Sequence, residues 1–186
     1  MDIEDYLNNH CNVILNIEKE KILKISEEII NAYRNNKKVI IFGNGGSAAD
    51  AQHFAAELVG KFEKDRKPLP ALALHCNTST VTAIGNDYGY EYTFDRQIEA
   101  FANSGDVIIA LSTSGNSKNV LRGIEKAKDL GCIVIGITGR SGGKMKDLIE
   151  EKYLIRLNSD ITSHIQEATI TILHIIAKIV ESNLFK

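Results

Sequence analysis

Two residues that can exchange protons or bind a metal ion, His53 and Glu57, stand four positions apart. In a helix this spacing places both side chains on one face, about 6 Å apart along the axis. An imidazole and a carboxylate so placed can share a divalent metal ion, or the carboxylate can act as a base that the imidazole orients. The same spacing also fits an exposed helix pair with no chemical role.

Two more polar residues, Gln166 and His174, interrupt an otherwise apolar segment near the C-terminus. A polar side chain in such a place carries a desolvation cost unless it finds a partner or a ligand, and a hydrogen-bonded core histidine is the usual outcome. Eight residues of helix rise by about 12 Å. The two side chains therefore either act at different ends of one pocket or belong to a site to which two chains contribute.

Two runs of small polar residues each follow a stretch typical of a buried parallel strand. Residues 43–47, Gly-Asn-Gly-Gly-Ser, come after Val39–Phe42, and residues 112–117, Ser-Thr-Ser-Gly-Asn-Ser, come after the run 107–111. At the start of a helix, backbone N–H groups and hydroxyls are free to hold an anion. No P-loop lysine follows the second run. The two loops together predict a pocket for a phosphorylated polyol.

Each of these motifs also fits a purely structural role. The second run can be a turn whose last serine caps a helix, and a Gly-rich turn after a strand often serves close packing only. The first run lacks the G-x-G-x-x-G spacing of a dinucleotide site. Asn86 and Asp87 can bind sugar hydroxyls, although by composition they fit a turn or a helix stop better.

The elements that would position these residues alternate along the chain. Apolar residues at helical spacing predict one or two amphipathic helices over residues 6–35. After them we expect a strand at 38–42, a helix at 47–62, a strand at 71–75, helices at 79–84 and 92–101, a strand at 106–111, a helix at 117–129, a strand at 132–137 and a short strand at 153–157. This alternation predicts one α/β domain over residues 1–186, with a helical segment over residues 1–36 and a mostly parallel sheet covered on both faces.

The last segment, residues 162–184, is expected to form one long helix. Apolar residues cover much of its circumference, whereas a surface helix needs only one apolar stripe. We therefore expect this helix to pack against both the sheet and a second subunit of a homo-oligomer, with the first helices also at the interface.

Composition favours a small-molecule partner and a cytoplasmic location. The formal net charge is −2 with Lys and Arg spread along the chain, so no basic stripe for nucleic acid is present. Cys11, Cys76 and Cys132 lie far apart and form no C-x-x-C pair, which is typical of ordinary thiols in a reducing compartment. The sequence has neither an apolar signal core nor a run of about 18 apolar residues, so neither secretion nor membrane insertion is expected.

Taken together, these motifs resemble the sugar isomerase (SIS) fold and, within it, the phosphoheptose isomerases. The loop at 112–117 marks only the wider phosphosugar-binding superfamily, whereas its combination with His53, Glu57, Gln166 and His174 is specific to the heptose enzymes. The resemblance extends from the N-terminal helices to the last residues. It implies a three-layer, flavodoxin-like sandwich with long terminal helices, and a homotetramer whose sites are shared between subunits.

The resemblance also implies an activity. Enzymes of this family are aldose–ketose isomerases that interconvert sedoheptulose 7-phosphate and D-glycero-D-manno-heptose 7-phosphate through an enediolate, the step that leads to bacterial surface heptose in lipopolysaccharide or capsule. By analogy Glu57 and His174 perform proton transfer. The implied metal is zinc, with no nucleotide cofactor, and its ligands would be His53, Glu57, Gln166 and His174. The implied substrate-binding residues are Ser112, Thr113, Ser114 and Ser117 for the phosphate, and Asn44, Gly45, Gly46, Ser47, Glu57, Asn86, Asp87 and Gln166 for the sugar.

Three positions depart from the family pattern. Lys61 stands where many relatives have Arg, and Ser163 and Thr169 replace residues that are often Asp and His. Lys cannot make the bidentate contact of Arg, so these departures bear on substrate preference. Two alternatives stay open: a non-catalytic SIS scaffold that binds a replication initiator protein, and an isomerase of another phosphosugar. The presence of both a carboxylate and an imidazole favours an enzyme.

Overall fold

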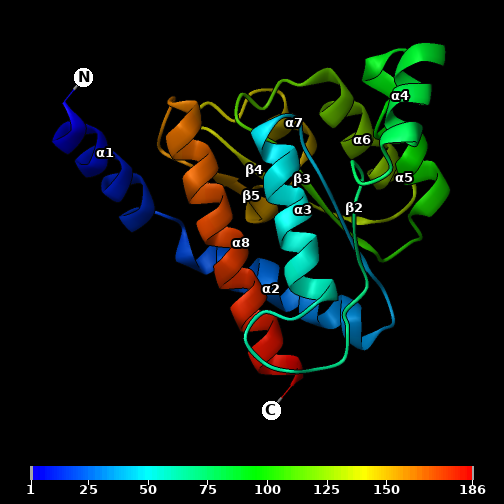
Figure 1. The fold of residues 1–186 in the computed structure, drawn as a ribbon, viewed down its shortest axis with the longest axis horizontal. Coiled ribbons are helices and arrows are strands. Elements are labelled where there is room, and N and C mark those ends of the chain that lie inside the picture. The colour runs from blue at the N-terminus through cyan, green and yellow to red at the C-terminus, as the bar shows by residue number, and fades with distance from the viewer. Residues whose placement is uncertain (1, 186) are drawn as a thin grey trace.

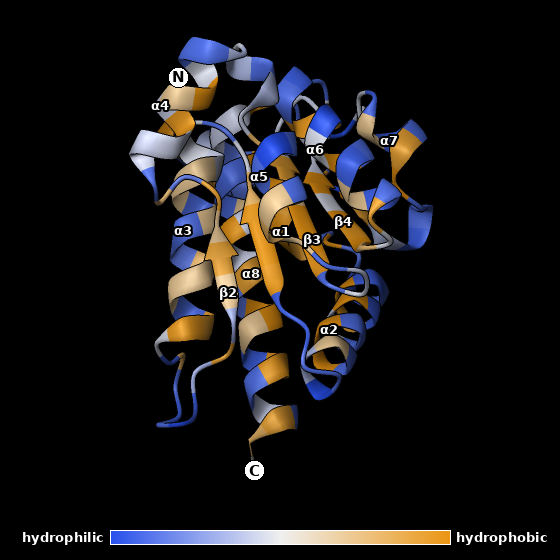
Figure 2. Cartoon of the chain, turned by 90° about the vertical axis from the view of Figure 1, so that its right-hand side faces the viewer, coloured by the Kyte–Doolittle hydropathy of each residue, from blue (hydrophilic) through white to orange (hydrophobic). Residues whose placement is uncertain are grey.

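The computed structural model describes residues 2–185 and has three layers, with a parallel sheet between two layers of helices (Figure 1). The five strands pair in the order β2-β1-β3-β4-β5. Their bounds are β1 Val39–Phe42, β2 Ala71–Ala73, β3 Val107–Ser112, β4 Ile133–Thr138 and β5 Leu154–Arg156. The central strands β1 and β3 are buried throughout, as expected for Val- and Ile-rich strands covered on both faces. Figure 2 shows these strands as the most hydrophobic part of the chain.

Helices α2 (Lys19–Arg34), α3 (Gly46–Val59) and α8 (Thr162–Leu184) cover one face of the sheet, and α5 (Asp95–Phe101) and α6 (Lys118–Asp129) cover the other. Helix α1 (Ile3–Leu15) lies at one side, in contact with α8 (Figure 1). The remaining elements are α4 Thr78–Asp87, α7 Met145–Leu148 and the short 3₁₀ turns η1 Tyr90–Tyr92 and η2 Glu151–Tyr153. No helix within residues 2–185 combines the length and the apolar character needed to cross a membrane.

The predicted alternation of strands and helices is confirmed, with differences at element ends. The helix expected at 47–62 ends at Val59, because Gly60 follows and its N–H closes the last turn on the Ala56 carbonyl. The helix expected at 92–101 begins only at Asp95, and the 3₁₀ turn η1 precedes it. The helix expected at 79–84 is longer and takes in Asn86 and Asp87 as its last turn. Local helix formation, closed by the Tyr88 N–H on the Ile84 carbonyl, therefore prevails over the turn preference of these two residues.

The order of the strands decides where a ligand can bind. Strand β1 lies between β2 and β3, with Val39 opposite both Ala71 and Val107. The connection that follows β1 therefore leads to β2 on one side of the sheet, and the connection that follows β3 leads to β4 on the other side. In such sheets ligands bind in the crevice outside the carboxyl ends of the strands, at this switch point. The loops after β1 and β3 lie there side by side, close enough that a Cβ on Gly43 would meet the Leu111 carbonyl oxygen at 2.8 Å.

Candidate functional site

The loop after β1 is held by a network of neutral side chains. The amides of Asn44 and Asn119 exchange two hydrogen bonds, each of 2.9 Å, and the Tyr90 hydroxyl donates to Asn44 Oδ1 at 3.1 Å. Asn119 is buried and also donates to Thr93 Oγ1. Gly45 adopts a positive φ of 56° just before α3, which a glycine takes without strain. The network therefore fixes the conformation of the loop from the neighbouring α6.

The loop after β3 is braced in a different way. The Ser112 and Ser117 hydroxyls lie 3.1 Å apart, and Ser114 Oγ accepts the Asn116 N–H at 3.2 Å. Gly115 has a φ of 66°, and a Cβ there would collide with the Gly142 carbonyl of the loop after β4. A pocket of about 250 Å³ opens between these two loops and the start of α8; it is lined by Thr113, Ser114, Asn116, Gly139, Arg140, Ser141, Ser159, Asp160, Thr162 and Ile165. The lining offers several hydroxyls, whereas its one guanidinium, that of Arg140, pairs with the Asp160 carboxylate at 3.2 Å.

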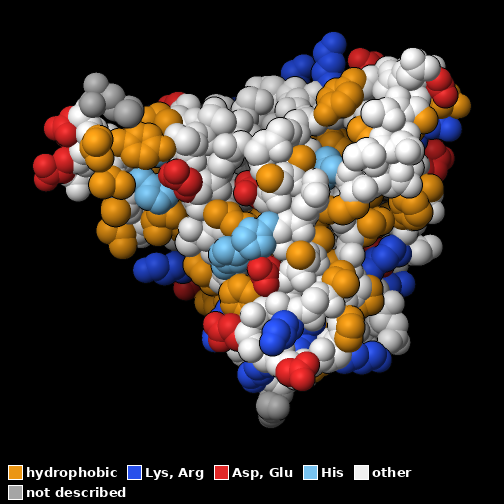
Figure 3. Space-filling model, in the orientation of Figure 1, with side chains coloured by type: hydrophobic (Ala, Val, Ile, Leu, Met, Phe, Trp, Pro, Cys, Tyr) orange, Lys and Arg blue, Asp and Glu red, His pale blue; other side chains and the backbone are white. Residues whose placement is uncertain are grey.

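The titratable residues singled out in the sequence meet elsewhere, where α3 and α8 run side by side. His53 Nε2 lies 3.0 Å from Glu57 Oε1 and 3.4 Å from His174 Nε2. The His53 side chain is 49% exposed and that of Glu57 is 22% exposed. Figure 3 shows histidine side chains beside a carboxylate on the face of the molecule that α3 and α8 form. We call His53, Glu57 and His174 the seam cluster.

The seam cluster has the donor set and spacing of a metal site. One ligand atom from each of the three residues lies within 4.8 Å of the others. In a tetrahedral zinc site with bonds of about 2.0–2.1 Å, the donor atoms lie roughly 3.3 Å apart, close to the separations of 3.0 and 3.4 Å found around His53 Nε2. Two imidazoles and one carboxylate are also ligands that zinc prefers. The residues present therefore fit a zinc ion.

Gln166, the fourth residue of the ligand set that the resemblance implies, lies at the other end of the α3–α8 contact. Its amide packs against Gly46, where a Cβ would collide with it. Gly46 precedes His53 by seven residues, or roughly 10 Å of helix. Within one chain the structure thus brings three of the four residues together. Gln166 lies instead beside the loop after β1, a position that fits either alternative, action at different ends of one pocket or a site to which two chains contribute.

Within residues 2–185, no hydrogen bond joins Asn86 or Asp87 to the loops after β1 and β3. Asn86 and Asp87 hydrogen-bond to each other at 2.7 Å in the exposed last turn of α4. Asp87 lines a separate surface pocket with Arg96 and Phe101. Of the other predicted residues, Gly45 and Gly46 are exposed at the first turn of α3, whereas Ser47 is buried.

The three positions that depart from the family pattern have ordinary environments. Lys61 is exposed just after α3. Ser163 Oγ accepts a hydrogen bond of 2.8 Å from the Tyr6 hydroxyl, which links α8 to α1. Thr169 is buried and donates to the Ile165 carbonyl within α8.

Several residues near the site carry no local signal in the sequence. His75 has its Nε2 2.6 Å from the Gly43 carbonyl oxygen. Burial lowers the pKa of His75, opposed by that backbone hydrogen bond, so a neutral ring can donate from Nε2. Asp50 lies one turn before His53 and has a buried carboxylate oxygen with no partner. Burial raises the pKa of Asp50 to about 6, although His53 acts to lower it.

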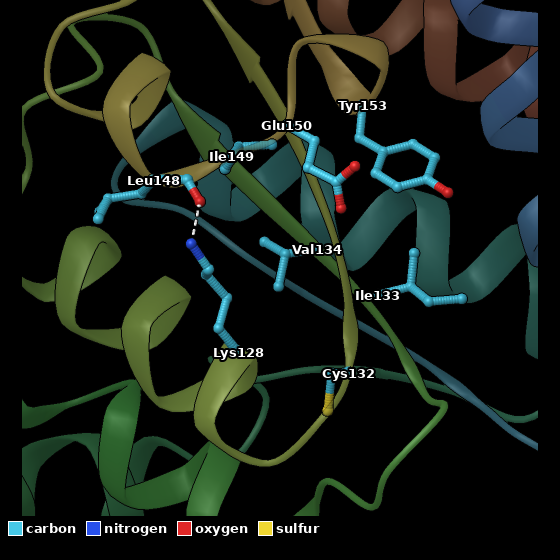
Figure 4. Close-up of a pocket in the computed structure, with 8 residues that line it drawn as sticks. All are labelled: Lys128, Cys132, Ile133, Val134, Leu148, Ile149, Glu150 and Tyr153. Atoms are coloured by element: carbon cyan, nitrogen blue, oxygen red, sulfur yellow. Dashed lines mark hydrogen bonds between the residues drawn. The ribbon is translucent and has the colours of Figure 1, made fainter.

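A further pocket, of about 290 Å³, lies away from all of these residues, where β4 begins (Figure 4). Its polar groups are largely satisfied or inert. Lys128 Nζ donates to the Leu148 carbonyl at 2.6 Å. Burial and the nearby Asp106 raise the pKa of the Cys132 thiol to about 11, which disfavours the reactive thiolate near neutral pH. This pocket has no group suited to the chemistry considered above.

Comparisons with known proteins agree with this geometry. A family model described as the SIS domain matches residues 4–139. The chain is 52% identical to a probable phosphoheptose isomerase of Thermoplasma acidophilum over 97% of its own length and 98% of the relative. It is 47% identical to the phosphoheptose isomerase of Geobacter metallireducens over all of its own length and 98% of the relative. The solved structure of the phosphoheptose isomerase from Neisseria gonorrhoeae superposes with a TM-score of 0.90 at 36% identity, covering 97% of both chains. The chain belongs to the phosphoheptose isomerase family of SIS-domain proteins.

Proposed function

We propose that the chain interconverts sedoheptulose 7-phosphate and D-glycero-D-manno-heptose 7-phosphate, as one domain over residues 1–186 in the supply of surface heptose. The observation that carries the proposal is the seam cluster, because a binding scaffold has no need for two imidazoles and a carboxylate within 4.8 Å of one another. Membership of the phosphoheptose isomerase family supports the substrate.

The phosphate is assigned to the loop after β3. Its hydroxyls come from Ser112, Thr113, Ser114 and Ser117, and the start of α6 adds free N–H groups. The sugar hydroxyls are assigned to Asn44, Gly45, Gly46, Ser47, Asn86, Asp87 and Gln166, and to Glu57 at the reacting end. Asn86 and Asp87 would contribute from the last turn of α4, where they hydrogen-bond to each other.

Two groups suffice for the proton transfers. The Glu57 carboxylate removes a proton from C1 of the ketose, which gives an enediolate, and a proton is returned to C2 to form the aldose. His174 moves the hydroxyl proton between the oxygens on C2 and C1. His53 Nε2 lies 3.4 Å from His174 Nε2 and 3.0 Å from Glu57 Oε1, so both imidazoles are near the carboxylate. No electron leaves the substrate, so the reaction needs no redox cofactor.

Zinc is proposed at the seam cluster, held by His53, Glu57 and His174, with Gln166 as the fourth ligand that the family resemblance implies. When bound, the metal would polarise the carbonyl and stabilise the negative charge that develops on its oxygen. An amide is an uncommon zinc ligand. Because Gln166 lies beside Gly46, either its side chain must move toward the other three ligands or a second subunit must supply the fourth ligand.

We also propose a homotetramer, located in the cytoplasm. Helix α1 supports an interface, because Ile3, Leu7 and Leu15 are exposed by 72%, 54% and 75%, and exposed apolar side chains gathered on one helix are typical of a surface that another chain covers. The separation between the seam cluster and the loops along α3 supports sites completed by a partner. Sedimentation velocity would test the assembly, and a monomer would contradict it.

The activity is tested by incubating the purified protein with sedoheptulose 7-phosphate in deuterated water and following the product by NMR. One sample is treated with a chelator and a second is treated and then restored with zinc. We expect an aldose heptose 7-phosphate labelled at C2, loss of conversion after chelation and recovery with zinc. A folded oligomer that converts nothing under any metal condition would favour the scaffold or another phosphosugar.

A further inference from the structure

A buried ion pair joins the far ends of α3 and α8, below the seam cluster. Arg66 Nε donates to Glu181 Oε1 at 3.1 Å, and both side chains are 2% exposed. Arg66 lies in the loop that leaves α3 and passes around the end of α8 (Figure 1). Burying two charges is costly unless every polar atom of the pair finds a partner. The hydrogen bonds that Arg66 and Glu181 make therefore indicate what the pair does in the structure.

The guanidinium of Arg66 is directed at the end of α3. Its Nη2 donates to the Glu57 carbonyl at 2.7 Å, and its Nη1 donates to the Leu58 carbonyl at 2.7 Å. Carbonyls in the last turn of a helix have no partner within the helix, and a cation there also stabilises the helix dipole. Arg66 therefore binds the backbone of the residue whose side chain belongs to the seam cluster.

The carboxylate of Glu181 is directed at the loop. Its oxygens accept the N–H groups of Phe62, Glu63 and Lys64 at 3.0–3.2 Å. The Phe62 ring in turn lies beside the His174 imidazole, with ring centroids 5.8 Å apart. Glu181 follows His174 by seven residues, so both belong to the same face of α8. One end of the ion pair is thus connected to Glu57 and the other to His174.

From these contacts we infer that Arg66 and Glu181 are positioning residues that fix α3 against α8 and thereby set the separation of His53, Glu57 and His174. The inference rests on the proposed function, which gives that separation its role. A slip of one helix along the other changes the distance between His53 and His174 directly, and metal sites tolerate errors of only about 0.2 Å. Neither residue touches the substrate in this account.

The chain offers a matched control. Glu63 and Lys178 form a second ion pair between the same loop and the same helix, but it is about half exposed and no hydrogen bond joins it to α3. Glu63→Gln therefore removes a charge from the same region without touching the carbonyls of α3. Ile124→Ala serves as a second control, because Ile124 is buried in α6 on the other face of the sheet and its truncation lowers stability without altering the α3–α8 contact.

The experiment measures the Zn²⁺ affinity of the apoprotein by chelator competition, together with kcat and KM, for the wild type, Glu181→Gln, Arg66→Lys and the two controls. Arg66→Lys keeps the charge but cannot reach both carbonyls and the carboxylate. We expect both variants to bind Zn²⁺ at least about tenfold more weakly and to lose kcat more than KM, as residues that orient metal ligands do. Both controls should stay within about twofold of the wild type.

Four outcomes each overturn a claim. Unchanged Zn²⁺ affinity in folded Glu181→Gln and Arg66→Lys refutes the positioning role, and so does an equal loss in Ile124→Ala, since stability alone would then explain the effect. A wild type that neither binds Zn²⁺ nor converts the sugar refutes the proposed function, and the positioning role falls with it. A wild type that does both while the variants match Glu63→Gln refutes the positioning role alone.

Discussion

The two loops after β1 and β3 and the seam cluster are built on different principles. The loops are held by neutral hydrogen bonds, such as those between Asn44 and Asn119, which fasten each turn to an adjacent element. The seam cluster consists of titratable side chains on two helices, with His53 and His174 separated by 121 positions in sequence. The loops are thus shaped in advance for the binding role proposed for them, whereas the seam cluster exists only because α3 and α8 pack in one register.

This difference has consequences for substitution. A change in the loops should alter backbone conformation, and with it stability and the binding of the phosphosugar. A change in the seam cluster should alter reaction rate and metal binding with little cost in folding, because His53 and Glu57 lie on the partly exposed side of α3. Substitutions that separate these two kinds of effect test the comparison.

The largest effect is expected at Glu57. Glu57→Gln keeps the size of the side chain but removes the proposed base and a charge from the proposed zinc site, so kcat for sedoheptulose 7-phosphate should fall by about a thousandfold. His174→Ala should likewise abolish turnover. Thermal unfolding should change little in either variant. Glu63→Gln, a nearby exposed carboxylate, provides the control, and substantial turnover by Glu57→Gln would remove this residue from the mechanism.

The next effect concerns the loop after β3. Gly115→Ala introduces a Cβ at a φ of 66°, against the Gly142 carbonyl, and should lower the free energy of unfolding by about 3 kcal/mol. Gly45→Ala separates the two causes of this loss: Gly45 also has a positive φ, with a ψ of −122° that L-residues avoid, but nothing lies within 4 Å of the added Cβ, so its loss of about 2 kcal/mol would come from backbone strain alone. Urea unfolding of both variants measures the difference. Equal losses would show that the close approach of the two loops adds nothing to the destabilisation of Gly115→Ala.

The same contrast explains what the sequence could predict. The strands, the loops after β1 and β3 and the final helix follow from local signals, because apolar runs and Gly- or Ser-rich turns report on neighbouring residues only. The parallel order of the strands and the position of the two loops at one edge then follow from general rules of connection. Element ends were less accurate, as at Val59, where Gly60 and the contacts of Arg66 stop α3 three residues early.

The seam cluster was only half predictable. The spacing of His53 and Glu57 gives their common face, and both were named together with His174. The sequence holds no local signal that α3 lies against α8 with His53 beside His174, because that register depends on packing and on the contacts of Arg66 and Glu181. Family resemblance supplied what periodicity could not. Asn119 and His75 escaped notice because each acts on a loop far away in sequence.

A smaller effect is expected where α6 supports the loop after β1. Asn119→Ala removes one hydrogen bond from each polar group of the Asn44 amide, and it also removes the hydrogen bond to Thr93. We expect a loss of about 1–2 kcal/mol in stability, the usual cost of unpairing part-buried amides. Because the loop is proposed to hold the sugar, KM should rise while kcat changes less. A fall in kcat alone would place Asn119 with the seam cluster and blur the distinction between the two regions.

The smallest effect concerns Asp50, which lies on α3 between the loop and the seam cluster. Burial raises its pKa to about 6, opposed by His53, so folding disfavours the ionised form. The free energy of unfolding is therefore highest below the unfolded pKa of Asp50, about 3.9, and declines as the pH rises through about 6. Asp50→Asn removes this decline, and after allowance for solvent screening it should stabilise the metal-free protein by at most about 1 kcal/mol at pH 7.5 relative to pH 4.5. Urea unfolding of wild type and variant at both pH values, with a chelator present, measures the difference. If Asp50→Asn instead lost stability at pH 7.5, the ionised Asp50 carboxylate of the wild type would have to accept a hydrogen bond. Its charge would then act together with the seam cluster.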